Sequence, residues 1–383
     1  MEKDTILVLI QLIGGNDSLN TFVPLASYEE LTRHRANILI PQNKLLVHDK
    51  VGFHPAVSGL YSLYNAGELC LINNIGYPMP NRSHFRSMDI WNSGSPSNEQ
   101  WNTGWIGRLL DLYHRKFPVG YPSSNFPDPL AISLGSIVSD TCQGQFHNFS
   151  HVVDNLDVFT EVDRCAISAY SNRAYGELMT YLDSTIKLSN LYTRQIESAA
   201  KKGNTLHNYP ANNQLARELK IVSQLISGGL QTKIYVLSIN GFDTHAYQTA
   251  KDDATQGMHS IYLKLLSEAV HAFTQDLKKL GHFNRVSILA YSEFGRQIKS
   301  NASFGTDHGD ATSLFMIGNS LAAPMLGNLP VIGEHVEQQA GLSTEIDFRN
   351  FYSSFAEQWF GLPRQEAQSL FTAEARHYTL FKT

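Results

Sequence analysis

Asp243 and His245 stand two residues apart, directly after an apolar, β-branched run that begins at Ile234. Gly241 separates the pair from that run, so the pattern predicts a buried strand followed by a loop. In open α/β sheets, ligands and reacting groups gather at the carboxyl ends of the strands. A carboxylate and an imidazole delivered to such an edge can share a metal ion or a proton.

Other polar clusters lie near strand-like runs in the same way. They are Gly-Gly-Asn-Asp at 14–17, Asn-Arg-Ser-His at 81–84, Ser-Glu-Phe-Gly-Arg at 292–296 and Thr-Asp-His-Gly at 306–309. Because the carboxyl ends of parallel strands meet at one edge of a sheet, we expect these clusters to converge on one site.

Carboxylates and imidazoles within these clusters are the candidate metal ligands. They are Asp17, Asp243, His245, Asp307 and His308. Mixed carboxylate and imidazole ligands suit zinc, manganese or iron better than magnesium or calcium. We expect one or two divalent ions, with zinc or manganese preferred. For Asp17, a turn or helix-cap role is the alternative.

Ser83 is the candidate nucleophile. It lies between Arg82 and His84 at a predicted helix start, where backbone N–H groups and the helix dipole favour an anion or an alkoxide. The alternative is a plain N-cap. No serine lies in a Gly-x-Ser-x-Gly turn, so the triad of α/β-hydrolases is not expected.

The cluster at 292–296 adds a carboxylate and a guanidinium group. Glu293 is a candidate general base or metal ligand, and Arg296 could clamp an anionic ester through its forked donors. A surface ion pair between the two is the alternative. We also predict that Arg82, Asn16 and His84 bind the substrate.

Strand-like and helix-like segments alternate along the chain. The strands are expected near 5–13, 69–75, 130–134, 234–240, 286–291 and 313–317, and the helices near 27–35, 55–66, 104–115, 253–280 and 348–360. This order predicts one α/β domain over 1–383, a doubly wound and mostly parallel sheet with helices on both faces. Residues 166–228 are predicted to form a helical insertion or layer within it.

The bulk composition excludes several classes of protein. The chain has 383 residues, 17% of them charged, and a net charge of −5, which gives no basic face for nucleic acid. Three scattered cysteines make neither a disulfide framework nor a zinc motif. No apolar run is long enough to span a membrane. From the candidate site we expect a small anionic ester as the partner. Without a signal-like N-terminus the expected location is cytoplasmic, or periplasmic or exported if a leader has been removed. The oligomeric state is left open.

The clusters and their flanks resemble the bacterial domain of unknown function 1501 family. The similarity rests on the segments at 12–24, 81–91, 241–245, 292–296 and 306–309, and runs from near residue 6 to near residue 361. That family is grouped with the alkaline phosphatase and sulfatase superfamily. The resemblance implies a doubly wound α/β fold, a site for one or two metals, and a Ser, Thr or modified Cys nucleophile.

Residue by residue, the resemblance implies that Asp17, Asp243, His245 and His308 are metal ligands and that Ser83 is the nucleophile. Phe294 stands where the superfamily has a metal-binding His, so one ligand of a two-zinc site is missing. The expected activity is metal-dependent hydrolysis of phosphate or sulfate esters, by a serine nucleophile or a metal-activated water. The alternatives are a non-catalytic binding protein on a degenerate fold of this kind, and an assembly or surface-associated protein without metal.

Overall fold

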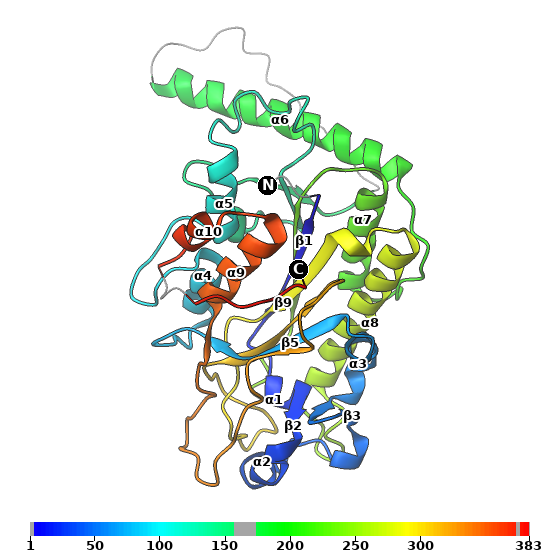
Figure 1. The fold of residues 1–383 in the computed structure, drawn as a ribbon, viewed down its shortest axis with the longest axis vertical. Coiled ribbons are helices and arrows are strands. Elements are labelled where there is room, and N and C mark those ends of the chain that lie inside the picture. The colour runs from blue at the N-terminus through cyan, green and yellow to red at the C-terminus, as the bar shows by residue number, and fades with distance from the viewer. Residues whose placement is uncertain (1–3, 157–173, 373–375, 383) are drawn as a thin grey trace.

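A mixed β-sheet runs through the centre of the protein, as Figure 1 shows. The computed structural model describes residues 4–156, 174–372 and 376–382. In these residues the strands of the sheet are β1 (Ile6–Ile13), β5 (Leu69–Gly76), β6 (Ala131–Leu134), β7 (Ser150–Val153), β8 (Ile234–Asn240), β9 (Val286–Tyr291), β10 (Thr312–Ile317), β11 (Met325–Leu326) and β12 (Ile346–Asp347). The six strands predicted from sequence are all present.

The strand order is β11-β5-β10-β9-β1-β8-β6-β7, and β12 also pairs with β5. All pairs are parallel except those of β10, which runs antiparallel to both β5 and β9. The predicted α/β class with a mostly parallel sheet is therefore confirmed, and the one reversed strand makes the sheet mixed.

Helices cover both faces of the sheet. Along β1 the side chains of Val8 and Ile10 enter one core, and those of Leu7 and Leu9 enter the other, because successive side chains of a strand point to opposite faces. The first core is covered by α3 (Ser58–Asn65), α7 (Gln214–Ser227) and α8 (Met258–Lys279). The second is covered by α4 (His84–Ser93), α5 (Trp105–Tyr113) and α9 (Phe348–Phe360), on the opposite side of the sheet in Figure 1.

The predicted helical segment 166–228 contains two helices in its described part, α6 (Ala174–Lys202) and α7, while residues 166–173 lie outside the described residues. That these helices form an insertion within one domain stays a prediction. The helix predicted from 253 begins only at Met258, because Gly257 has a φ of +124°, which a right-handed helix does not allow. None of the described helices is long and apolar enough to cross a membrane.

A small antiparallel sheet next to the end of β1 was not predicted. Its strands are β2 (Phe22–Pro24), β3 (Leu46–His48) and β4 (Val51–Phe53), and α1 (Ser18–Thr21) and α2 (Tyr28–Arg35) adjoin it in the chain. Three-residue strands are too short to show an alternating pattern. The remaining described helix is α10 (Arg364–Ser369).

The topology brings the polar clusters to one edge. β1 lies between β8 and β9 and is parallel to both, so the chain leaves all three strands at the same edge. β5 ends at this edge as well and β10 begins there, because Ile75 pairs with Thr312. The convergence of these strand ends was expected from the sequence, and the side chains decide which residues meet.

Candidate metal centre

Three side chains from three different elements form a group of metal-ligating size. His84, at the start of α4, Asp243, after β8, and His308, before β10, each offer an atom within 4.8 Å of the others. His308 Nε2 lies 3.1 Å from Asp243 Oδ1, and His84 Nε2 lies 3.4 Å from Asp243 Oδ2. This group contains only ligand types that zinc and manganese accept.

His245 adjoins the same group. Its Nε2 atom lies 3.1 Å from Asp243 Oδ1 and 2.8 Å from His308 Nε2. Ligand atoms around a tetrahedral zinc stand roughly 3.3 Å apart, which follows from Zn–N bonds of about 2.0–2.1 Å. The spacing of these three atoms is therefore close to that of a coordinated ion.

The opposite nitrogen of each imidazole faces a hydrogen-bond acceptor. The pairs are His84 Nδ1 with Glu293 Oε1 at 2.7 Å, His245 Nδ1 with Asp307 Oδ1 at 2.8 Å, and His308 Nδ1 with the carbonyl oxygen of Arg82 at 2.8 Å. An acceptor beside each Nδ1 favours the tautomer with hydrogen on Nδ1, which leaves the lone pair on Nε2. Proteins orient metal-bound histidines with such contacts.

The donor set fits a cation. Two Nε2 lone pairs facing each other at 2.8 Å repel unless a proton or a metal ion lies between them. His84 Nε2 is buried and has no hydrogen-bond partner among the described residues, although Asp243 lies nearby. A divalent ion would satisfy these nitrogens and the Asp243 carboxylate together, so the residues present fit the metal predicted from sequence.

The charges of the site suit metal binding at neutral pH. Burial acts to raise the pKa of Asp243, but the hydrogen bond from Arg296 and the close contact with His308 outweigh it and lower the pKa to about 2. Burial lowers the pKa of His308, while the hydrogen bond to Glu293 raises the pKa of His84. Asp243 is therefore an anion and His308 a neutral imidazole, which are the protonation states that bind a metal, whereas at His84, whose pKa is raised, a metal ion competes with a proton.

Arg296 lies where it cannot clamp a substrate, contrary to the sequence prediction. Its side chain is 0% exposed and donates to Asp243 Oδ1 at 2.7 Å. Its remaining hydrogen bonds go to the backbone carbonyl oxygens of Gly14, Gly15, Phe242 and Thr306. These contacts fix the turn after β1 and the Asp243 carboxylate, so Arg296 acts as a positioning residue.

Glu293 is also enclosed, with its side chain 0% exposed. It accepts hydrogen bonds from the Gly14 backbone N–H and from His84. This geometry favours a role in orienting His84 over the predicted roles of ligand or general base. Phe294 packs against the rings of His84 and His308, with centroids 4.9 and 4.6 Å away, and forms an apolar wall beside them. A Cβ atom on Gly15 would lie 2.3 Å from the Phe294 ring, which explains the glycine there.

Asp17 and Asn16 serve the scaffold beneath the site. Both Asp17 carboxylate oxygens accept from Arg35, at 3.0 and 2.8 Å, in a fully buried ion pair, and Gln248 donates to one of them. Asn16 Oδ1 bonds His259 and Thr21. Neither side chain belongs to the metal-sized group, so the predicted ligand and substrate-binding roles have no geometric support.

The Asp17–Arg35 pair yields a prediction that separates scaffold from ligand. Asp17→Asn should lower the free energy of unfolding by about 3 kcal/mol, because it leaves the Arg35 charge buried without its partner. The metal content of the folded variant should equal that of the wild type. Urea denaturation of the metal-free protein and elemental analysis measure the two effects. Loss of metal at unchanged stability would return Asp17 to the ligand set.

Arg82 and Ser83 lie beside the metal-sized group. The Arg82 guanidinium makes a two-pronged ion pair with Asp310, at 2.9 and 2.7 Å, and stays one-third exposed. Ser83 is exposed at the N-cap of α4, and its hydroxyl makes no capping hydrogen bond. Ser83 therefore occupies the N-cap position without the side-chain hydrogen bond that the N-cap alternative requires. Its role as the nucleophile stays a prediction.

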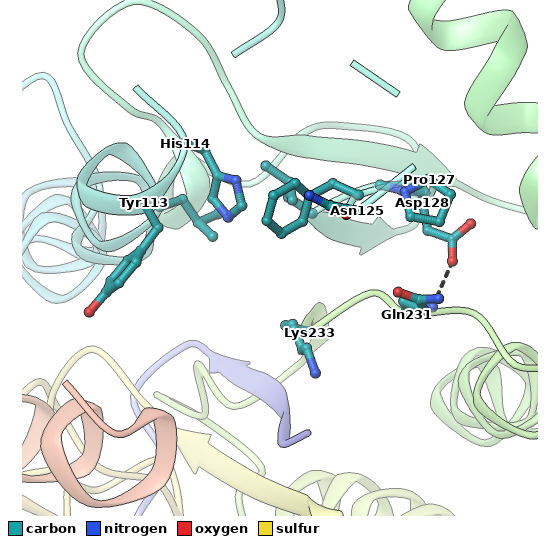
Figure 2. A pocket seen from close by; sticks show the side chains of 11 residues that line it. Tyr113, His114, Asn125, Pro127, Asp128, Gln231 and Lys233 are labelled. Carbon is teal, nitrogen blue, oxygen red and sulfur yellow. Dashed lines mark hydrogen bonds between the residues drawn. The ribbon is translucent and has the colours of Figure 1, made fainter. Parts of the chain in front are cut away.

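A separate cavity of about 360 Å³ lies at the other edge of the sheet, where β6 and β8 begin (Figure 2). Asp128 in this cavity accepts a hydrogen bond from the Gln231 backbone N–H, and Lys233 pairs with Asp4. Burial lowers the pKa of His114 to about 4. The charged groups here are paired with the protein itself, so this cavity does not resemble the metal centre.

The fold and site together define a mixed α/β protein with a histidine and carboxylate metal-sized group at the carboxyl edge of its sheet. The chain belongs to the DUF1501 family, described as proteins of unknown function, whose model matches residues 70–370. No curated protein matches the sequence.

Several solved structures resemble this fold at low sequence identity. The lipoteichoic acid synthase LtaP from Listeria monocytogenes has a TM-score of 0.39 at 11% identity, covering 97% of this chain and 75% of its own. A protein in the alkaline phosphatase superfamily from Vibrio parahaemolyticus has a TM-score of 0.40 at 9% identity, and the match covers 86% of this chain and 64% of that protein. The PsFucS1 sulfatase from Pseudoalteromonas sp. has a TM-score of 0.39 at 11% identity, and the match covers 94% of this chain and 69% of the sulfatase. Likenesses this distant transfer neither a site nor a reaction.

His84 was predicted to bind the substrate and was not among the predicted metal ligands, but the structure places it in the metal-sized group. The available signal was its position at the end of the Asn-Arg-Ser-His cluster, after β5. Its partner Glu293 is 209 residues away, so the hydrogen bond that orients the ring could not be read from local spacing.

Proposed function

We propose that this protein is a metal-dependent hydrolase of phosphate or sulfate esters. The observation that carries the proposal is the common orientation of three imidazoles. Each has its Nδ1 atom on an acceptor, so that the Nε2 atoms of His84, His245 and His308 are left to face the Asp243 carboxylate region. A purely structural cluster has no need to hold three such rings with unshared lone pairs directed together.

His84, Asp243 and His308 would hold the metal, with His245 at its side. A divalent ion bound there would polarise the ester oxygen and lower the pKa of a hydroxyl or water. Asp243 and His245 are nearly half exposed, which leaves room for an anion to reach the site. Arg296 holds Asp243 in place from below, and the partly exposed ion pair of Arg82 with Asp310 lies beside the opening.

Ser83 supports the serine route over a bound water. Its exposed hydroxyl precedes His84 directly and lies at the amino end of α4, where the helix dipole favours negative charge. In this route the Ser83 oxygen bonds to phosphorus or sulfur, and the alcohol leaves with a proton. Water then releases the anion and restores the hydroxyl.

The test is metal-restored turnover of generic esters. Chelated protein should be inactive towards aryl phosphates and aryl sulfates, and added zinc or manganese should restore turnover of one of the two classes by at least about a hundred-fold. Elemental analysis of the same samples gives the stoichiometry. Tight metal binding without turnover of any ester would favour the non-catalytic binding protein, for which the Phe294 departure is the sequence argument.

A further inference from the structure

A groove of about 330 Å³ lies over the carboxyl-end half of β1, β8 and β6. Two residues that line this groove are next in sequence to residues of the metal centre or to residues that contact it. Ile13, which lines it, precedes Gly14, whose backbone N–H and carbonyl contact Glu293 and Arg296. Phe85, which also lines it, follows His84. A molecule in the groove would therefore extend from the site where the ester bond is placed.

The groove exists because the helix layer stops short of the end of the sheet. Leu7 and Leu9 of β1 are fully covered by the second core, but Gln11 on the same face is only partly buried. Its neighbour in β8, Ser238, is exposed. From above, α4 presents four residues at helical spacing to the groove, namely Phe85, Met88, Asp89 and Asn92.

The rim of the groove is apolar and unusually exposed. Phe85 is 81% exposed, Ile137 is 79% exposed and Val138 is 46% exposed, although they come from α4 and from the loop after β6. Large apolar side chains gathered in solvent at one groove mark a surface that contacts another molecule. Inside, Gln11 Nε2 is enclosed and has no hydrogen-bond partner among the described residues, so an oxygen on that molecule would satisfy it.

The charges of the groove restrict what it accepts. Asp89 and Asp140 line it, and no lysine or arginine does so among the described residues, although Arg86 pairs with Asp89 at 3.9 Å from outside the lining. A lining that contains carboxylates and no cationic side chain disfavours a second anionic group. A metal ion at the centre would supply positive charge at one end only, so an occupant would place its single anionic group there and its uncharged part in the groove.

We propose that this groove binds the organic part of the substrate, and that the substrate is a phosphate or sulfate monoester of an aromatic or similarly bulky apolar alcohol. The inference rests on the proposed function, because the ester group must lie at the metal centre for its alcohol to reach Phe85. The groove then selects substrates by the apolar surface that they bury, while the metal centre selects the anion.

The test uses non-hydrolysable anions on protein incubated with zinc, with binding measured by isothermal titration calorimetry. Phenylphosphonate is compared with methylphosphonate, and benzenesulfonate with methanesulfonate. In the wild type the aromatic member of the binding pair should have a Kd about ten-fold lower, since burial of a ring-sized apolar surface is favourable. Phe85→Ala and Ile137→Ser should reduce this ratio to below about three-fold.

Phe146→Ala is the matched control, because Phe146 is equally exposed, at 80%, and does not line the groove. It should keep the wild-type ratio. If the anions bind but the aromatic and methyl forms bind equally, or if Phe85→Ala leaves the ratio unchanged, the groove proposal is overturned while the proposed function stands. If no anion binds to the zinc-treated protein, both proposals are overturned.

Discussion

His308→Ala is expected to remove the metal from the protein without unfolding it. His308 Nε2 lies within 3.1 Å of both Asp243 Oδ1 and the adjoining His245 Nε2, so it occupies the centre of the group of candidate ligand atoms. Loss of only the hydrogen-bonding partner of a metal ligand costs about 10–100-fold in affinity. Loss of the ligand itself should therefore raise the Kd for zinc by at least about a hundred-fold. Competition with a chelating dye measures this change.

Stability of the metal-free protein separates a ligand from a packing residue. The His308 side chain is 20% exposed, packs on Phe294 and bonds the Arg82 carbonyl, so the metal-free variant should lose no more than about 2 kcal/mol relative to the metal-free wild type and should stay folded. His335→Ala is the control, since His335 is exposed and belongs to no metal-sized group among the described residues. It should keep full zinc affinity. Equal zinc affinity in both variants would remove His308 from the centre.

The fold was largely predictable because its strands are long and apolar. β1, β5, β8 and β9 each have six or more residues, which is enough for a run of apolar side chains to stand out. Most strands of two to four residues, such as β3, β7 and β11, have no such pattern and were missed, although the four-residue β6 was predicted. Their pairing depends on neighbours that lie far away in the chain.

The place of the site was also predictable, because parallel strands end together, but the roles of its side chains were only partly so. Asp17 and Asp243 both follow a strand and a glycine, and local spacing gives them equal claims to a metal. Arg35 and Arg296 make the difference: one buries Asp17 in a complete ion pair, and the other holds Asp243 by a single oxygen at the surface. The role of Arg296 could not be predicted from local sequence either, since its partners besides Asp243 are backbone carbonyls, which no motif reveals.

Ser83→Ala is the substitution with the largest expected effect on turnover. If Ser83 is the nucleophile, the variant should lose turnover by up to roughly a million-fold, as enzymes do when their nucleophile is removed. Its zinc affinity and melting temperature should not change, because the Ser83 hydroxyl makes no capping hydrogen bond and the side chain is exposed. Steady-state kinetics on the best ester, after zinc has been restored to both proteins, measures the ratio.

Ser303 provides a matched control for this substitution. Its backbone N–H bonds Asn301 Oδ1 at 2.9 Å, just as the Ser83 N–H bonds Asn81 Oδ1 at 2.9 Å, and both serines are exposed. Ser303→Ala removes the same atom from the same kind of turn, so it should leave turnover within about two-fold of the wild type, as expected for an exposed surface substitution. If Ser83→Ala also stays within a few-fold, then water attacks the ester directly and Ser83 is not catalytic. Trapping with a labelled substrate decides independently, because only the serine route leaves the phosphoryl or sulfuryl group on the Ser83 oxygen after rapid denaturation.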